Sequence, residues 1–192
     1  MNRYTTFDSP LGQILLVSDG SHLTGAYFSG QKYEPVPTPG LGWRSEPDLA
    51  IFQDASLQLH EYFAGRRRQF VIPLHLQGTP FQMKVWNALL EIPLGSTVSY
   101  RELAGRIKRK NAVRAVGAAV GRNAVSVIVP CHRVIGSGGA LTGYAGGLER
   151  KRALLDLEGA TMAGIAHPRR QRIVLSVQRT CSDFNREEKG GR

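Results

Sequence analysis

A thiol and an imidazole stand side by side at Cys131 and His132, and this pair is the part of the sequence best suited to chemistry. The apolar, β-branched residues 127–129 and then Pro130 come before it, which predicts that a strand ends just ahead of the thiol. Buried structural cysteines usually lie inside apolar runs, whereas Cys131 lies at the polar end of one. A thiol beside a potential base at the end of a strand favours a lowered pKa and a nucleophilic role. The pair alone leaves a structural cysteine equally open.

The positive charge of the chain is concentrated in its middle and its C-terminal part. The 192 residues carry a net charge of +10, and residues 76–160 hold 12 basic against 5 acidic side chains. Residues 161–192 hold 7 against 3, while residues 1–75 hold 6 against 7. Such a field attracts polyanions, because neutralising phosphates supplies most of the sequence-independent affinity of nucleic-acid binders. Charge alone leaves a solvated basic surface as open as a nucleic-acid partner.

Composition and cysteine content restrict the class of protein. A hydrophobic content of 42% and a charged content of 21% are typical of a soluble globular protein. No apolar run has the length of a bilayer span, and the first residues lack the layout of a secretion signal, so we expect a cytoplasmic protein. The two cysteines, Cys131 and Cys181, lack the Cys/His spacing of a zinc site. We therefore predict no disulfide framework, no metal and no cofactor.

The elements that must position Cys131 and His132 fall into two units. Together they predict an α/β (α+β) fold class. Residues 1–75 alternate β-prone runs with turn signals and predict a small N-terminal α/β domain with antiparallel hairpins. Helical spacing predicts a helix that Asp48 caps and Gly65 ends, and residues 70–72 read as a further strand. This unit carries no catalytic constellation. Residues 161–192 predict a basic, partly disordered tail in which Cys181 is a bystander.

Residues 76–160 predict a mostly helical domain that contains the cysteine loop. Thr79 and Pro80 open one helix, and the capping box from Ser99 to Glu102 opens a second. Asn111 is the expected cap of a third helix over 112–121. Two short helices joined by a few residues have the layout of a helix-turn-helix, although packed helices alone give the same pattern.

The third helix of this domain is slim, because most of its side chains are small, and basic residues surround it. Residues 114–119 read Arg-Ala-Val-Gly-Ala-Ala, and Gly117 costs a helix about 1 kcal/mol relative to alanine. Small residues allow a helix to approach another surface closely, which fits tight helix packing or insertion into a DNA groove. Residues 99–123 hold seven basic side chains against one acidic side chain, and core packing needs no such charge. The balance favours DNA.

Residues 129–136, Val-Pro-Cys-His-Arg-Val-Ile-Gly, resemble the active-site signature of the methylated-DNA–protein-cysteine methyltransferases, also called O6-alkylguanine-DNA alkyltransferases. The resemblance continues in the same order at 81–86, 92–95, 99–100, 114–117, 123, 141–148 and 154–158. It implies DNA repair by direct, irreversible, single-turnover transfer of a methyl or alkyl group to Cys131. The donor would be O6 of guanine, and also O4 of thymine, in double-stranded DNA, with no cofactor.

The resemblance also implies a role for individual residues. Cys131 would accept the alkyl group, His132 would take the thiol proton through a water molecule, and Glu158 would orient the imidazole. Tyr100 would donate a hydrogen bond to guanine N3, and Asn123 would tie the preceding turn to the cysteine loop. The base pocket would be lined by Tyr144, Ala145, Gly146 and Val134.

By the same resemblance the slim helix would lie in the DNA minor groove, and Arg114 would fill the gap left when the damaged nucleotide is flipped out. The residues expected to bind DNA are Arg114, Ala115, Gly117, Ala118, Ser99, Lys108, Arg109, Lys110, Arg122 and Arg133. The protein would act as a monomer, with clustering on DNA left open.

Two departures and two alternatives stand beside this assignment. The family commonly has Ile-Gly-x-Pro before the third helix, whereas residues 107–110 read Ile-Lys-Arg-Lys, which puts the geometry of that turn in question. After Asn123 the family usually has Pro-Ile, and here Ala124 and Val125 follow.

The alternatives are a non-catalytic alkylguanine-binding protein, against which Cys131 argues, and a cysteine hydrolase, in which adjacent Cys and His rarely form the dyad.

Overall fold

The computed structural model describes residues 1–38 and 40–160. In chain order its elements are β1 (Asn2–Ser9), β2 (Gly12–Ser18), β3 (Leu23–Phe28), β4 (Trp43–Ser45), α1 (Ala50–Phe63), α2 (Pro80–Leu90), β5 (Val98–Ser99), α3 (Tyr100–Arg106), α4 (Val113–Val120), the 3-10 helix η1 (Cys131–Arg133), β6 (Val134–Ile135), the 3-10 helix η2 (Ser137–Gly139) and α5 (Leu148–Leu157). No helix within these ranges has the length and apolarity needed to cross a membrane. The tail expected over 161–192, with Cys181, lies outside the described residues.

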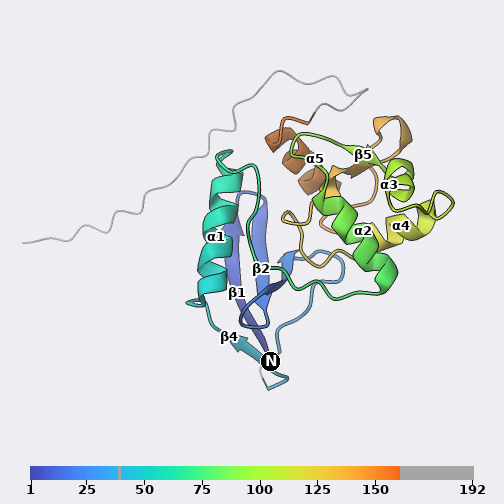
Figure 1. The fold of residues 1–192 in the computed structure, drawn as a ribbon. Helices are drawn as coiled ribbons and strands as arrows, with labels where there is room; N and C mark the ends of the chain where they lie inside the picture. Colours follow the sequence, from blue (N-terminus) through green and yellow to red (C-terminus); the bar gives the residue numbers. More distant parts are fainter. Residues whose placement is uncertain (39, 161–192) are drawn as a thin grey trace, which may run out of the picture.

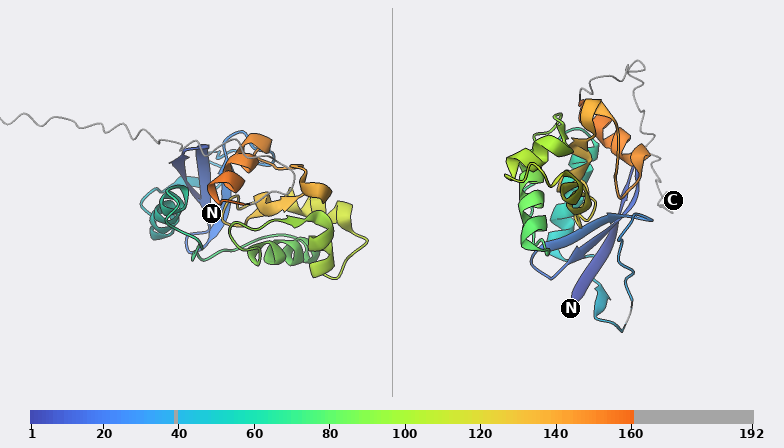
Figure 2. Two further views of the ribbon diagram at one scale, coloured as in Figure 1. Left: turned by 90° about the horizontal axis from the view of Figure 1, so that it is seen from above. Right: turned by 90° about the vertical axis from the view of Figure 1, so that its right-hand side faces the viewer.

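The N-terminal part is a four-stranded sheet in the order β3-β2-β1-β4, and the expected α/β class with antiparallel hairpins is confirmed. β4 runs parallel to β1 at the edge. Helix α1 lies on one side of the sheet, and the helical C-terminal part lies on the other (Figure 1; Figure 2, left). The central strand β2 is therefore covered on both faces, and its residues 14–17 are all buried. The sheet is a layer that joins the two parts.

Helix α1 begins later than the sequence indicated. Asp48 was the expected cap, but the N-cap is Leu49, whose side chain makes no capping bond. The reason is a turn closed by the Leu49 N–H donating to Glu46 O at 3.3 Å, which places Asp48 outside the helix. The end was predicted correctly: the chain leaves the helix at Gly65, whose φ of +71° is a conformation that glycine adopts without strain.

The strand predicted at residues 70–72 is wrong. These residues form no ladder, because the backbone groups of Val71 are taken by a side chain of α1. Gln58 Oε1 accepts from Val71 N–H at 2.8 Å, and Gln58 Nε2 donates to Val71 O at 2.8 Å. The segment instead connects the two parts and makes one isolated bridge to the sheet between Leu74 and Leu23.

The helices of the C-terminal part begin as predicted in two of three cases. Thr79 caps α2 with Gln82, and Ser99 caps α3 with Glu102, each pair forming a complete capping box. Asn111 does not cap α4, since the N-cap is Ala112, without a side-chain bond. Helix α4 packs closely on α2, and Trp86 Nε1 of α2 donates to Ala119 O at 2.9 Å. The pair β5 and β6 then joins the start of α3 to the residues that follow the cysteine.

The backbone of the turn between α3 and α4 shows how the unusual sequence at residues 107–110 is accommodated. Lys108 has a φ of +57°, and its N–H donates to Gly105 O at 3.0 Å. The N–H of Arg109 donates to Ala104 O at 2.8 Å, which completes the Schellman arrangement that usually ends in glycine. The lysine therefore adopts the glycine conformation at a cost of about 1 kcal/mol.

We therefore expect Lys108→Gly to raise the free energy of unfolding by about 1 kcal/mol, because glycine removes the left-handed strain. Chemical denaturation of the variant and of the wild type measures the difference. Lys110→Gly is the matched control, since it removes the same charge at a residue without positive φ and is expected to destabilise the protein. A Lys108→Gly protein no more stable than the wild type would contradict the assignment of strain.

Candidate active site around a buried thiol

The segment before Cys131 is a compact turn, so the strand predicted at residues 127–129 is wrong. Val127 has a φ of +71°, which is rare and strained for a β-branched residue. The turn is held by β3, where the N–H of Ala26 donates to Ala124 O at 2.9 Å. The carbonyl oxygen of Ala26 accepts from Ser126 N–H at 2.8 Å. Backbone pairing with the N-terminal sheet thus fixes the turn that carries the cysteine.

Asn123 holds the same turn from inside. Its Oδ1 accepts from Val125 N–H at 3.0 Å, and its Nδ2 lies 2.9 Å from Val129 O and 3.2 Å from Val125 O. The same amide nitrogen lies 3.1 Å from Cys131 Sγ. A single buried side chain therefore connects the turn to the thiol that follows it.

The thiol is buried, with Cys131 only 4% exposed. Burial raises the pKa of Cys131 above its ordinary value, which is the opposite of the lowered pKa expected from the sequence. Polar groups oppose this effect: the Asn123 amide, the charge of Lys151 and the N–H groups of Cys131 and His132 all favour the thiolate. The resting sulfur is a neutral thiol that is surrounded by groups able to stabilise an anion.

His132 is fully buried and has one occupied and one free ring nitrogen. Its Nε2 lies 2.8 Å from Glu158 Oε1. An ionised carboxylate only accepts hydrogen bonds, so the proton sits on Nε2. Nδ1 is buried without a protein partner among the described residues and is a bare acceptor. Burial lowers the pKa of His132, which keeps the ring neutral and able to act as a base.

The carboxylate of Glu158 takes part in four hydrogen bonds, with Tyr62, His132 and Arg133. Arg133 Nε donates to Oε2 and Arg133 Nη2 donates to Oε1, both at 2.9 Å. The hydroxyl of Tyr62, from α1, donates to Oε1 at 2.8 Å. Burial opposes the charged form, but the bonds from His132 and Arg133 lower the pKa of Glu158 to about 2. The acid is therefore ionised, and it draws one donor from the N-terminal part of the chain.

Arg133 does not lie where the sequence analysis placed it. We expected it to contact DNA, but its guanidinium is buried, paired with Glu158 and bonded to Ile92 O at 2.5 Å. If the Arg133 guanidinium moved out to contact a phosphate, the buried Glu158 carboxylate would lose hydrogen bonds that stabilise its charge. The expected DNA contact of Arg133 is thus corrected to a contact inside the site. Tyr62 was missed, because nothing local distinguishes it from other buried aromatics of a helix.

Lys151 is the second residue that sequence reasoning missed. Its buried Nζ donates to Val134 O at 2.5 Å, Thr142 O at 2.6 Å and Gly143 O at 3.2 Å. Burial lowers the pKa of Lys151 to about 8, and the ammonium still lies close enough to favour a charged Cys131. A signal existed: Lys151 occupies the apolar stripe of α5 three and four residues before Leu154 and Leu155.

The loop expected to wall a base pocket is bonded to Tyr100. The hydroxyl of Tyr100, the first residue of α3, lies 3.3 Å from the carbonyl oxygens of Thr142 and Gly143. Burial raises the pKa of Tyr100, and the nearby Cys131 raises it further. The Tyr144 hydroxyl is buried without a protein partner among the described residues. Ala145 and Gly146 continue the same loop, and Val134 is fully buried, with its carbonyl bound to Lys151.

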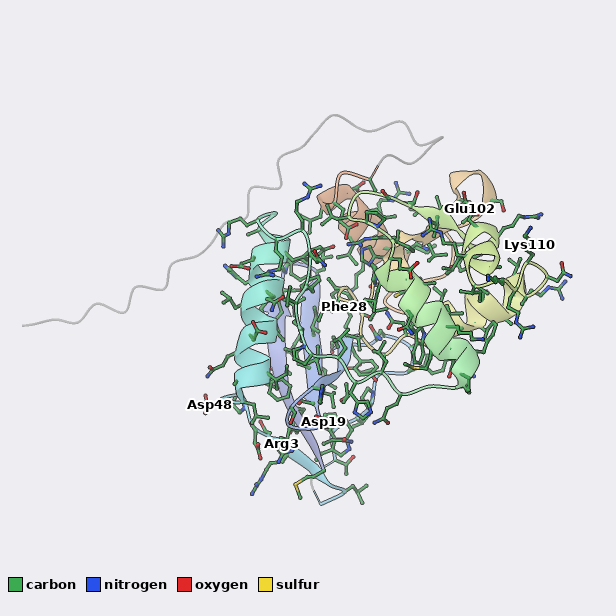
Figure 3. The ribbon with its side chains drawn as sticks, viewed as in Figure 1. Arg3, Asp19, Phe28, Asp48, Glu102 and Lys110 are labelled. Atoms are coloured by element: carbon green, nitrogen blue, oxygen red, sulfur yellow. The ribbon has the colours of Figure 1, made fainter. Side chains whose placement is uncertain are left out.

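The exposed face of α4 is narrow and carries a basic residue at its start. Arg114, Ala115 and Ala118 are exposed, and Gly117 is half-buried. A Cβ added at Gly117 would lie 3.7 Å from the Tyr100 ring, so the helix backbone lies directly against the site. The exposed cations Lys108, Arg109 and Lys110 occupy the preceding turn, and Lys110 lies at the outer edge of the helical part (Figure 3).

Comparison with known proteins places these features in a family. Residues 2–76 match the family described as 6-O-methylguanine DNA methyltransferase, ribonuclease-like domain, and residues 80–160 match its DNA binding domain. The chain is 51% identical over 158 residues to the methylated-DNA–protein-cysteine methyltransferase of Mycobacterium tuberculosis, covering 82% of this chain and 93% of that protein. The constitutive enzyme of that name from Bacillus subtilis is 44% identical over 161 residues, covering 82% and 96%.

A solved structure of similar fold is the crystal structure of Mycobacterium tuberculosis OGT in complex with DNA. Its TM-score against this chain is 0.76 at 48% sequence identity, and the match covers 82% of this chain and 92% of that one. The likeness therefore extends through both the sheet and the helical part.

Loss of the Glu158 charge has an expected effect on stability. Glu158→Gln leaves Arg133 buried without an anion, so the free energy of unfolding at pH 7 should fall by about 3 kcal/mol or more. The folded pKa of about 2 lies below the ordinary 4.5, so the unfolded chain binds the proton first. The stabilisation is complete above about pH 4.5 and is lost as the pH falls toward 2.

Denaturant titrations at pH values from 7 to 3 test this expectation. The wild type should lose stability below pH 4.5 more steeply than Glu158→Gln, which lacks the titrating group. Glu91→Gln is the control, because Glu91 is an exposed carboxylate at the end of α2. Parallel pH curves for the wild type and Glu158→Gln would show that the folded carboxylate is not held in its charged form.

Proposed function

The chain belongs to the methylated-DNA–protein-cysteine methyltransferase family and repairs DNA by alkyl transfer to a cysteine, and on that premise we propose that Cys131 is the acceptor for the alkyl group on O6 of guanine. The observation that carries the assignment is the buried Cys131 Sγ, bonded to Asn123 beside His132 and its carboxylate. O4-alkylthymine is a second proposed substrate. Transfer is irreversible, so each molecule acts once.

In the proposed reaction, the bond from the alkyl carbon to Sγ forms as the bond to O6 breaks. The thiol proton moves to His132 Nδ1 through one water molecule, which the bare Nδ1 supports. The imidazolium that forms is stabilised by Glu158 at Nε2. Asn123 and Lys151 stabilise the developing thiolate. A soft thiolate suits attack on a carbon attached to an aryl-ether-like oxygen.

The leaving guanine takes electrons into its ring as the C–O6 bond breaks, and the proton that His132 took from the thiol balances this charge when it passes to the base. We propose that the Tyr100 hydroxyl donates a hydrogen bond to guanine N3, where negative charge develops. Burial raises the pKa of Tyr100, which keeps the hydroxyl protonated as this role requires. Tyr144, Ala145 and Gly146 would wall the pocket around the base, and Val134 would support it from beneath.

A base inside the duplex cannot reach a buried thiol, so the nucleotide must be flipped out at a cost of a few kcal/mol. We propose that α4 enters the minor groove, with Ala115, Gly117 and Ala118 approaching the duplex and Arg114 filling the vacated stack. Ser99, Lys108, Arg109, Lys110 and Arg122 would contact the DNA backbone, and Arg133 is no longer among these contacts. Exposure of Arg114 on the slim face of α4 supports this placement.

The proposed domain roles, cellular location and oligomeric state rest on the same family membership. Residues 1–75 would be a supporting domain, and residues 76–160 would bind DNA and carry out the transfer. We propose a cytoplasmic monomer that acts on double-stranded DNA. The non-catalytic alkylguanine-binding alternative has no observation in its favour, since the thiol and its neighbours are present.

We expect Cys131→Ser to abolish transfer from duplex DNA that carries labelled O6-methylguanine, because an alcohol cannot replace the thiolate. The wild type should take up at most one label per molecule, and peptide mapping should find it on Cys131. Cys181→Ser, which changes the other cysteine of the chain, is the matched control and should react like the wild type. Removal of methyl groups by Cys131→Ser would overturn the assignment, and multiple turnover would favour a hydrolase.

Arg114→Ala should slow repair of O6-methylguanine in duplex DNA at least tenfold, while the rate with free O6-benzylguanine stays unchanged. The reason is that only the duplex substrate requires extrusion of the base. Single-turnover kinetics on both substrates measure the two rates. Arg152→Ala, which removes an exposed arginine from α5, is the control. Equal losses on both substrates would show that Arg114 does not act in extrusion.

A further inference from the structure

Tyr33, in the loop after β3, has a backbone conformation that the sequence does not explain. Its φ is +68°, which costs a non-glycine residue about 1–2 kcal/mol, and the side chain is 52% exposed. Strain of this kind persists only where neighbouring contacts hold the backbone, and it is concentrated at functional sites. The conformation belongs to a turn that Glu34 N–H closes by donating to Gln31 O at 3.2 Å, and this turn fixes the place of the exposed ring.

The loop is held against the proposed base pocket by bonds between the two parts of the chain. Lys32 N–H donates to Ala145 O at 3.1 Å, and Ser126 Oγ donates to Gln31 Oε1 at 3.0 Å. Arg150 Nη2 donates to Ser29 O at 3.2 Å, and the guanidinium of Arg150 lies over the ring of Phe28 at 4.9 Å. Figure 3 shows Phe28 where the sheet meets the helical part. The loop thus has a fixed place beside the site.

Two cations meet at the ring of Tyr33. Lys32 Nζ lies 5.0 Å from the ring centroid, and Arg122 Cζ, from the end of α4, lies 5.5 Å from it. Neither cation forms a salt bridge within residues 1–38 and 40–160, and Glu34 Oε2 instead accepts from Gly30 N–H at 2.7 Å. The ring attracts both charges, but the charges repel each other. An anion placed between them would relieve that repulsion.

Arg122 lies just beyond α4, two residues after the last helical residue, Val120. Arg114, Ala118 and Arg122 are all exposed. An eight-residue helix is about 12 Å long, so cations stand at both of its ends. Lys108, Arg109 and Lys110 occupy one end, and Arg122 with Lys32 occupies the other.

We propose that Lys32, Tyr33 and Arg122 form a second phosphate-binding ledge, built from both parts of the chain, that contacts the DNA backbone at the C-terminal end of α4. The proposal rests on the placement of α4 in the groove and extends the DNA contact to the N-terminal part. The ring of Tyr33 has both cations within 5.5 Å of its centroid. The ligand is the phosphodiester backbone, so the ledge acts without regard to sequence or damage.

The test measures the affinity of Lys32→Gln and Arg122→Gln for undamaged and O6-methylguanine duplexes over a range of salt concentrations. Each change should weaken binding to both duplexes by about fivefold at low salt and reduce the slope of log K against log salt by about one. The rate of Lys32→Gln with free O6-benzylguanine should stay at the wild-type value. Arg44→Gln is the matched control, because it removes the same charge from β4, at the far end of the sheet from α4 (Figure 1).

The proposed ledge would be ruled out if the Lys32 and Arg122 variants showed the same slope of log K against log salt as Arg44→Gln. Loss of reactivity of Lys32→Gln toward free O6-benzylguanine would also overturn it, since it would indicate a role in the base pocket. These failures are distinct from failure of the proposed function. In that case the wild type itself would take no label from damaged DNA, or Arg114→Ala would repair duplex DNA normally.

Discussion

The site depends on one buried negative charge, the carboxylate of Glu158. Removing a carboxylate from water costs several kcal/mol, and only well-placed donors repay that cost. Here the donors come from distant segments: Tyr62 from α1, and His132 and Arg133 from the residues after the cysteine. The carboxylate therefore fixes the imidazole and also joins the two parts of the chain. Without the sheet and α1 it would lose a partner, which gives the N-terminal part a physical role in the chemistry.

Burial of the site explains why the thiol rests in its neutral form. Arg133 already balances much of the Glu158 charge, and burial keeps His132 uncharged, so no imidazolium stands ready beside the sulfur. The groups that favour the thiolate, above all Asn123 and Lys151, are nevertheless in place. A neutral, buried thiol avoids reaction with other electrophiles. In the proposed transfer, the thiolate forms only when an alkylated base is bound, and the surrounding groups need no reorganisation at that moment.

Local sequence signals predicted the parts of the fold that local chemistry determines. The capping boxes of α2 and α3 were found because their partners lie three residues apart. The strands predicted at residues 70–72 and 127–129 failed because side chains of Gln58 and Asn123 take the backbone groups that a ladder would use. Tyr62 and Arg133 could not be assigned for a related reason. Their roles depend on a contact with Glu158 across 96 and 25 residues of chain.

Glu158 holds a neutral His132 with its proton on Nε2, which leaves Nδ1 free for the thiol proton of the proposed transfer. Nitrogen-15 NMR of the imidazole in the unreacted protein can test this arrangement, because protonated and bare ring nitrogens differ strongly in chemical shift. We expect a neutral ring at pH 7, with a protonated Nε2 and a bare Nδ1. An imidazolium, or a neutral ring with its proton on Nδ1, would contradict it.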